Sequence, residues 1–368
     1  MAKDRYVAYV GTYTHGSSVG IHIFDVDAEK GKMTERKVVP INNPSDLIVS
    51  TSGKFLYSIA DEGVQSFRIL EDGDLEPINS VWTGGMRGCY LEVDEQDRYL
   101  FVAGYHDGRI TMMNLNEDGS IGEIADGIFH KGIGVNITDR SSMPHVTCVK
   151  VTPDQQCVCA VDSGLDQVKI YRIDREHNKL ELEDILRCEL DSGPKMLRYD
   201  RQHKYAYVLC EIDNVIEVYE VGERDDDVDP FKLIQRISTI EPGEKQRAAA
   251  SGIEFSPDGN HLFVTNAGIN TAIIYDVDKE TGVLTPFFHC KTSGDYPKAL
   301  AVMPDNKHFI ILSHETNDQV SKLYWRLVDS SMKPLTVEEA FYMGTEGGGS
   351  FFGKVGSFKE GYEFDAVV

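Results

Sequence analysis

The sequence predicts an all-β fold, a seven-bladed β-propeller of four-stranded antiparallel blades. The first observation is an internal repeat of strand, turn and strand, of which Ser251–Asn266 is the clearest copy. The second is the spacing, because successive copies begin roughly 45–57 residues apart, as suits a four-stranded blade with long loops. The third is the lack of a long amphipathic helical pattern. Since a ring of repeats can be one domain, we expect residues 1–368 to form a single domain.

Seven repeat units can be counted along the chain. The first is incomplete, with strands expected near 6–15, 19–27 and 33–39. The second begins at Asn43 and contains the same order of strands and turns. The later units begin at Gly88, Pro144, Pro194, Ser251 and Pro297.

The strand patterns within the units are of two kinds. Tyr205–Leu209 is a short apolar and aromatic run, which is typical of a strand buried on both faces. Gln167–Asp174 alternates between polar and apolar residues, so we expect it to be half exposed. Turns rich in Asp, Thr and Gly, such as Asp278–Gly282, separate the strands.

Closure of the ring needs an additional strand, because the first unit lacks an innermost one. A propeller normally takes the missing strand from the other terminus, which removes an exposed sheet edge. The stretch after Val337 is the only supplier, although about 341–368 is an atypical Gly-rich segment. Closure by this C-terminal segment is therefore a hypothesis.

Composition narrows the class of partner. The formal net charge of −23 argues against nucleic acid, since phosphate binding needs clustered Lys and Arg. It also disfavours an anionic membrane surface, and no apolar run approaches the ~18 residues that cross a bilayer. The N-terminus runs directly into a strand without a signal segment. The seven scattered cysteines form no CxxC pair, so we expect reduced thiols in a cytoplasmic protein. The sequence does not predict the oligomeric state.

A propeller brings distant parts of the chain together at one end of its central channel, which is a good place for a small ligand. Polar residues occupy this place in most units. Those before or at the innermost strands are His145, Lys195, Ser251 and Lys298; those after the second strands are Tyr13, Asp61, Glu62, Tyr105, His106, Asp162, Glu211, Asn266, His314 and Glu315. Their spacings match no metal-ligand motif, so no metal is expected. Each could instead be a structural residue, such as a hydrogen-bonded His145 or a Glu211 that pairs with Lys195.

Several stretches resemble one known family. They are Tyr9–Thr14 with Gly20-Ile21, Asn43–Ser45 with Phe55–Tyr57, Tyr99–Gly108, Pro144-His145, Gly193-Pro194 with Tyr205–Glu211, Ser256–Asn266 and Tyr296-Pro297. Together they resemble the seven-bladed propeller lactonases, which include propeller-type 6-phosphogluconolactonases and carboxy-cis,cis-muconate cyclases. The likeness covers about residues 6–328 and is spread over the chain.

The resemblance implies a site made of a His, an Arg, a Glu and a second Arg. His145 and Glu211 match this pattern, whereas Lys195 and Ala267 stand where the family has its two arginines. Thr147 replaces a second family His, and Arg140 matches a basic residue that usually precedes the motif. Because Lys is a point charge and Arg a planar fork, the replacements weaken the case for a strongly anionic substrate.

The function that this resemblance implies is hydrolysis of a sugar lactone, either 6-phosphogluconolactone or a related aldonolactone. His145 or Glu211 would act as general acid or base, and Lys195 would stabilise the oxyanion. Substrate binding would fall to Arg140, Tyr105, His106, Asn266 and Lys298, and no cofactor is expected. The alternatives are a cycloisomerase or lyase acting on a carboxylated or sugar-derived substrate, and a non-catalytic ligand-binding propeller.

Overall fold

The computed structural model describes residues 6–28, 32–134, 143–222, 230–244, 247–292, 295–303 and 309–314. All described strands lie in one compact unit, Met1–Leu327. Arg140, Glu315 and the segment 341–368 lie outside the described residues. The single-domain prediction and closure by the C-terminal segment therefore stay predictions.

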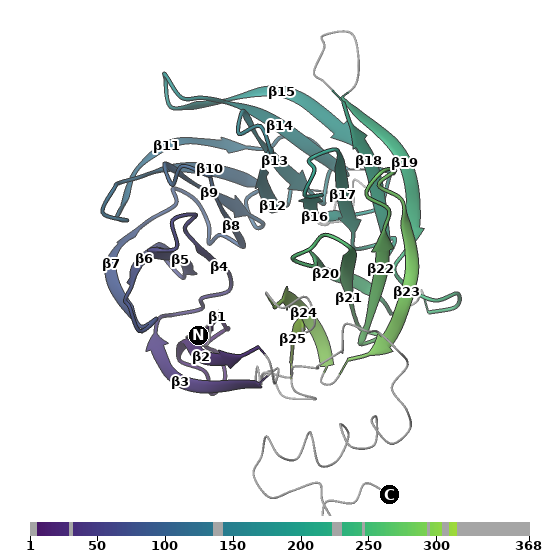
Figure 1. The fold of residues 1–368 in the computed structure, drawn as a ribbon. Coiled ribbons are helices and arrows are strands. Elements are labelled where there is room, and N and C mark those ends of the chain that lie inside the picture. Colours follow the sequence, from purple (N-terminus) through teal and green to yellow (C-terminus); the bar gives the residue numbers. More distant parts are fainter. Residues whose placement is uncertain are drawn as a thin grey trace, which may run out of the picture. The chain divides into compact units, whose positions relative to one another are not determined.

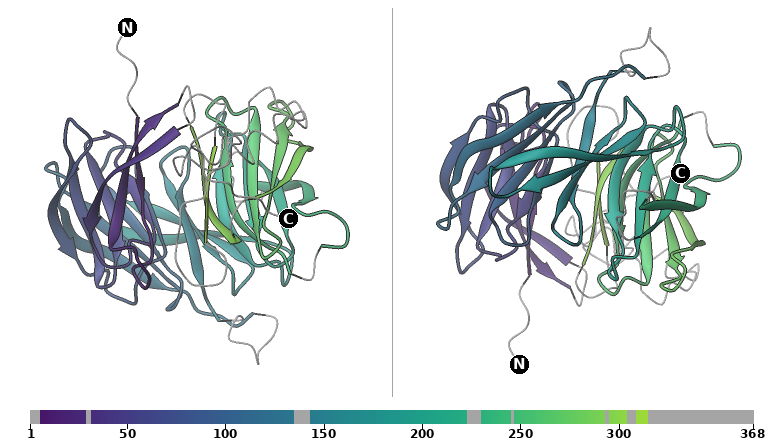
Figure 2. Two further views of the ribbon diagram at one scale, coloured as in Figure 1. Left: turned by 90° about the horizontal axis from the view of Figure 1, so that it is seen from below. Right: turned by 90° about the horizontal axis from the view of Figure 1, so that it is seen from above.

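The described part of the chain forms seven antiparallel sheets, which confirms the predicted propeller (Figure 1). Five of the sheets have four strands each, the first has three, and the last has two within the described residues. In every sheet, strands that are consecutive in the sequence are also neighbours in the sheet, as in blades built from hairpins. The side views in Figure 2 show the strands running along the axis of the ring.

The strand bounds follow the repeat. The first sheet holds β1 (Tyr6–Val10), β2 (Gly20–Asp27) and β3 (Lys32–Pro40). The second holds β4 (Leu47–Val49), β5 (Phe55–Ala60), β6 (Gly63–Ile69) and β7 (Leu75–Val81). The third holds β8 (Tyr90–Val93), β9 (Tyr99–Gly104), β10 (Arg109–Leu115) and β11 (Ile121–Phe129). The fourth holds β12 (Val146–Val151), β13 (Cys157–Asp162), β14 (Gln167–Asp174) and β15 (Lys179–Arg187).

The remaining three sheets repeat the order. The fifth holds β16 (Pro194–Tyr199), β17 (Tyr205–Cys210), β18 (Val215–Val221) and β19 (Phe231–Ser238). The sixth holds β20 (Ala249–Phe255), β21 (His261–Ala267), β22 (Thr271–Val277) and β23 (Leu284–Lys291). The seventh holds β24 (Asp295–Val302) and β25 (Phe309–His314).

The core lies between neighbouring sheets. Every residue of β9, β13 and β17 is buried, as their apolar composition predicts for second strands covered on both faces. Strand β14 was expected to be half exposed, but five of its eight residues are buried. The difference arises because third strands are also covered by the next sheet: Val168 and Ile170 pack in one cluster with Val208 of β17. Solvent reaches mainly the outer strands, such as β15.

The first and last sheets meet. Met303, directly after β24, packs in one cluster with Val10 of β1 and with Phe24 and Met33 of the first sheet. The seven sheets thus surround a central channel, whose wall consists of the inner strands β4, β8, β12, β16, β20 and β24 (Figure 1).

The antiparallel pairing defines the two ends of this channel. Each inner strand runs opposite to the second strand of its sheet, so the beginning of one lies beside the end of the other. We call this end the mouth. The turns from inner to second strands, including Ser256–Gly259, lie at the opposite end.

Two further observations concern the sequence expectations. No disulfide joins the seven cysteines, all of which fall within the described ranges. The described residues contain no helix long and apolar enough to cross a membrane.

Candidate functional site

The fourth, fifth and sixth sheets each contribute a one-residue bulge to the mouth. The pairing of β12, β16 and β20 with their neighbours shifts by one residue near the start of each strand. The extra residues are Thr147, Lys195 and Ser251, at equivalent positions of the repeat. Because a bulge changes the direction of a side chain, it is a common device beside functional sites.

Lys195 forms an ion pair at the mouth. Its Nζ donates to Oε1 of Glu211 at 2.8 Å. The two side chains are 24% and 31% exposed, so the pair is accessible from the channel. Glu211 directly follows β17, and its main-chain N–H is held by the carbonyl of Gly193 at 2.7 Å. This hydrogen bond fixes the backbone position from which the Glu211 side chain extends.

His145, directly before β12, stacks on Tyr105, which directly follows β9. The ring centroids are 4.3 Å apart and the rings are within 10° of parallel. His145 Nδ1 lies 2.8 Å from the main-chain carbonyl oxygen of Tyr105. A carbonyl can only accept, so Nδ1 carries the proton and Nε2 carries the lone pair in the neutral ring. The geometry thus defines the tautomer of His145.

A buried pair supports the main chain at His145. The carboxylate of Asp162 accepts from the His145 N–H at 2.9 Å and from Nδ1 of His130 at 2.6 Å. Both side chains of the Asp162–His130 pair are fully buried. Burial lowers the pKa of His130, although the hydrogen bond to Asp162 opposes this shift. This pair therefore anchors the start of β12.

The two pairs belong to one cluster, which we call the mouth cluster: Tyr105, His145, Lys195 and Glu211. Thr147 Oγ1 donates to the Lys195 carbonyl at 2.8 Å and so joins the two inner strands. Burial, and then the charge of Glu211, raise the pKa of Tyr105. Residues from the third, fourth and fifth sheets are thereby brought together as the sequence predicts.

A second group of side chains gathers around Tyr13. Nζ of Lys298 lies 3.2 Å from the Tyr13 hydroxyl and 4.4 Å from the ring centroid. The guanidinium carbon of Arg87 lies 5.3 Å from the same centroid, and Arg87 also pairs with Asp61 at 3.4 Å. Asn43 donates to Asp61 at 2.7 Å. We call Tyr13, Arg87 and Lys298 the cation group.

Arg87 was missed by sequence reasoning. It stands shortly before β8, just as His145 stands directly before β12, and this equivalence was the available signal. The contact itself joins the third sheet to the first and could not be seen in the sequence. Lys298, in contrast, was expected to bind substrate and does lie at the mouth.

The remaining predicted residues are placed differently. His106 is exposed and meets Tyr105 edge-on at 5.4 Å, at the border of the mouth cluster. Asn266 is fully buried, and its amide bonds to Thr239 at 2.7 and 2.8 Å and to Thr271 at 3.3 Å. These bonds join β21 to its own sheet and to the preceding loop, so the Asn266 side chain is not among those brought together at the mouth. Ala267 is buried beside it.

Within the described ranges, no three His, Cys, Asp or Glu side chains are grouped as ligands of a metal ion. The mouth offers an imidazole of defined tautomer, an ammonium–carboxylate pair and two further cations.

Comparison with known proteins places this chain in a family. The chain matches the family described as lactonase, 7-bladed beta-propeller, over residues 7–342. The chain belongs to this family. The resemblance noted in the sequence is thus confirmed.

Named relatives of this lactonase-family chain are similar over most of its length. A Bacillus subtilis 6-phosphogluconolactonase is 28% identical over 322 residues, which cover 86% of this chain and 90% of the relative. The crystal structure of a candidate 6-phosphogluconolactonase from Bacteroides fragilis has a TM-score of 0.78 and 28% identity, covering 90% and 96% of the two chains. A periplasmic gluconolactonase from Pseudomonas aeruginosa has a TM-score of 0.77, with 88% and 96% coverage, and at 23% identity it shows the shared fold. The relatives' names favour a lactone-hydrolysing activity for the family.

Proposed function

We propose that this chain is a hydrolase that opens a sugar lactone in the mouth of the propeller, with 6-phosphogluconolactone or a related aldonolactone as substrate. The observation that carries the proposal is the mouth cluster, in which His145 of defined tautomer lies in one group with the Lys195–Glu211 ion pair. An activated water and a cation for the oxyanion are the two requirements for hydrolysis of a cyclic ester.

His145 serves as the general base in this proposal. The Tyr105 carbonyl holds the Nδ1 proton, so Nε2 is the atom that takes the proton of the attacking water. The water oxygen forms a bond to the lactone carbonyl carbon, and the carbonyl oxygen becomes an oxyanion. When the ring C–O bond breaks, the protonated His145 returns the proton to the departing alkoxide, which becomes a hydroxyl group.

Lys195 stabilises the oxyanion through its ammonium group, and Glu211 holds that ammonium in position. Glu211 is less suited to be the base, because its Oε1 already accepts the hydrogen bond from Lys195 Nζ. The stacked ring of Tyr105 orients His145 and raises the apolar character of the site.

The cation group supplies charge for the far end of the substrate. Arg87 and Lys298 both approach the ring of Tyr13, and only Arg87 also bonds a carboxylate among the described residues. Two cations around one ring repel each other, and a phosphate dianion would relieve that repulsion. This group supports a phosphorylated lactone, even though Ala267 stands where the sequence resemblance implies an arginine.

A direct assay tests the proposal. Purified protein is given 6-phosphogluconolactone and, separately, unphosphorylated gluconolactone, and acid release is followed by pH-stat above the spontaneous rate. In ¹⁸O-water the product acid should carry one solvent oxygen. Folded protein that accelerates neither reaction would refute the hydrolase, and substrate consumption without solvent oxygen would indicate an isomerase or lyase instead. A cytoplasmic location is part of the proposal, supported by seven cysteines without a disulfide.

A further inference from the structure

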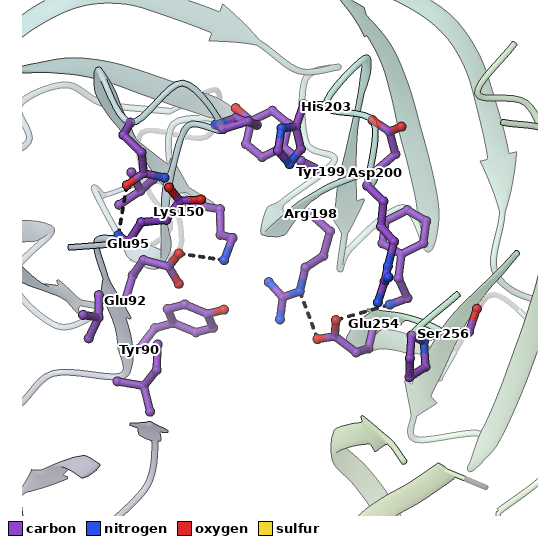
Figure 3. A pocket seen from close by; sticks show the side chains of 18 residues that line it. Tyr90, Glu92, Glu95, Lys150, Arg198, Tyr199, Asp200, His203, Glu254 and Ser256 are labelled. Carbon is purple, nitrogen blue, oxygen red and sulfur yellow. Dashed lines mark hydrogen bonds and ion pairs between the residues drawn. The ribbon is translucent and has the colours of Figure 1, made fainter. Parts of the chain in front are cut away.

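The central channel contains a cavity of about 530 Å³ at the end opposite to the mouth. Its wall is formed by the inner strands β8, β12, β16 and β20 and by the turns that follow them (Figure 3). The volume falls within the roughly 300–1,000 Å³ of small-molecule sites. None of its lining residues belongs to the mouth cluster or to the cation group. The proposed lactone chemistry therefore leaves this cavity without a role.

Two ion pairs cross the cavity wall from sheet to sheet. Nζ of Lys150 in β12 donates to Oε1 of Glu92 in β8 at 2.6 Å. Nε of Arg198 in β16 donates to Oε2 of Glu254 in β20 at 3.2 Å. Figure 3 shows the charged ends of Lys150 and Arg198 and the hydroxyl of Tyr90 directed toward the same space. Donors and acceptors thus alternate around one cavity.

Arg198 is central to this arrangement. Burial would lower its pKa, but Tyr90, Glu254 and Glu92 raise the pKa well above its ordinary value. Its guanidinium carbon lies 5.9 Å from the centroid of Tyr90. Arg198 therefore remains a cation between the two glutamates and beside an aromatic ring.

The lining as a whole is nearly balanced in charge. Lys150, Arg198 and Arg201 supply three positive charges, and Glu92, Glu95, Asp200 and Glu254 supply four negative ones. Because both signs line the cavity, a ligand with a net charge would be repelled by the lining groups of its own sign. A ligand with many hydroxyl groups would instead donate to the carboxylates and accept from the ammonium and guanidinium groups.

We propose that this cavity is a second small-molecule site, which binds a neutral polyhydroxylated compound such as a hexose. The charged pairs bind its hydroxyl groups, and Tyr90 offers an apolar ring to its C–H face. The site is separate from the proposed catalytic mouth, and its occupancy does not depend on lactone hydrolysis.

Three ligands with the same carbon skeleton and different charge test the proposal. D-Glucose, D-glucuronate and D-glucosamine are titrated into the full-length protein, and binding is measured by saturation-transfer NMR. We expect glucose to bind and each charged analogue to bind at least ten times more weakly. Tighter binding of glucuronate or glucosamine than of glucose, or no binding of any of the three, would overturn the proposal.

Two variants locate the bound sugar. Lys150→Met and Glu254→Gln should each weaken glucose binding at least fivefold, while their thermal midpoints show that the protein remains folded. Neither residue is in the proposed lactonase machinery, so lactone turnover should stay within twofold of the parent protein. Unchanged glucose affinity in both variants would place the sugar elsewhere and refute the second site, whatever the outcome of the lactone assay.

Discussion

Replacing Lys195 by Met is the most direct test of the catalytic reasoning. Met keeps much of the length of the side chain but removes the ammonium group. Loss of one oxyanion donor typically lowers kcat by about 10²–10³-fold. Because the Lys195 side chain is 24% exposed, water partly screens its charge, and we expect the lower end of this range, about 10²-fold.

The same substitution should have little effect on stability. At 2.8 Å the Coulomb energy of the Lys195–Glu211 pair is about 1.5 kcal/mol at the dielectric constant of water. Ordering of the two side chains offsets part of this energy, so accessible pairs contribute less than about 1 kcal/mol. The thermal midpoint should therefore fall by less than about 3 °C.

The assay compares Lys195→Met with two other variants. Lys232→Met is the matched control, because Lys232 also forms an ion pair, with Glu220 at 3.1 Å. That pair joins β18 and β19, the two outer strands of the same sheet, and does not line the channel. This control variant should retain full lactone turnover. Lys195→Arg introduces the residue type that the sequence resemblance implies at this position, keeps the positive charge and should retain most of the activity. If kcat of Lys195→Met stays within threefold of the parent protein, or equals that of Lys232→Met, the assigned role of Lys195 is wrong.

Three other predictions concern recognition and stability. Arg87→Met and Lys298→Met should each raise KM for 6-phosphogluconolactone about tenfold and change KM for gluconolactone less than threefold; equal effects on both substrates would contradict phosphate recognition. Burial raises the pKa of Asp46 to about 7. As the pH rises, this carboxyl therefore ionises in the unfolded chain before it does so in the folded protein, and the free energy of unfolding should fall as the pH is raised from about 4 to 7. Asp46→Asn should remove that fall in urea titrations. His130→Ala should cost about 3 kcal/mol in the same titrations, because it leaves Asp162 buried without this partner.

The architecture was predictable from the sequence because it depends on local patterns. Apolar runs such as Tyr205–Leu209 and recurring Asp-Gly turns specify strands and hairpins within each unit, and the spacing of units specifies blades. Topology then places equivalent residues of each unit at the same end of the channel. For this reason His145, Lys195 and Glu211 could be assigned to the mouth from their positions in the repeat.

The partners of each side chain were decided only by the tertiary structure. Asn266 was expected at the mouth, yet the strand register aligns it with Cys210, one residue before Glu211. Its amide is buried against Thr239 and Thr271. Arg87 and Lys298 come from different sheets and meet at Tyr13, which no local pattern indicates. The repeat determines where the backbone of each residue lies, whereas hydrogen bonds and charges depend on side chains from other blades, which are distant in the sequence.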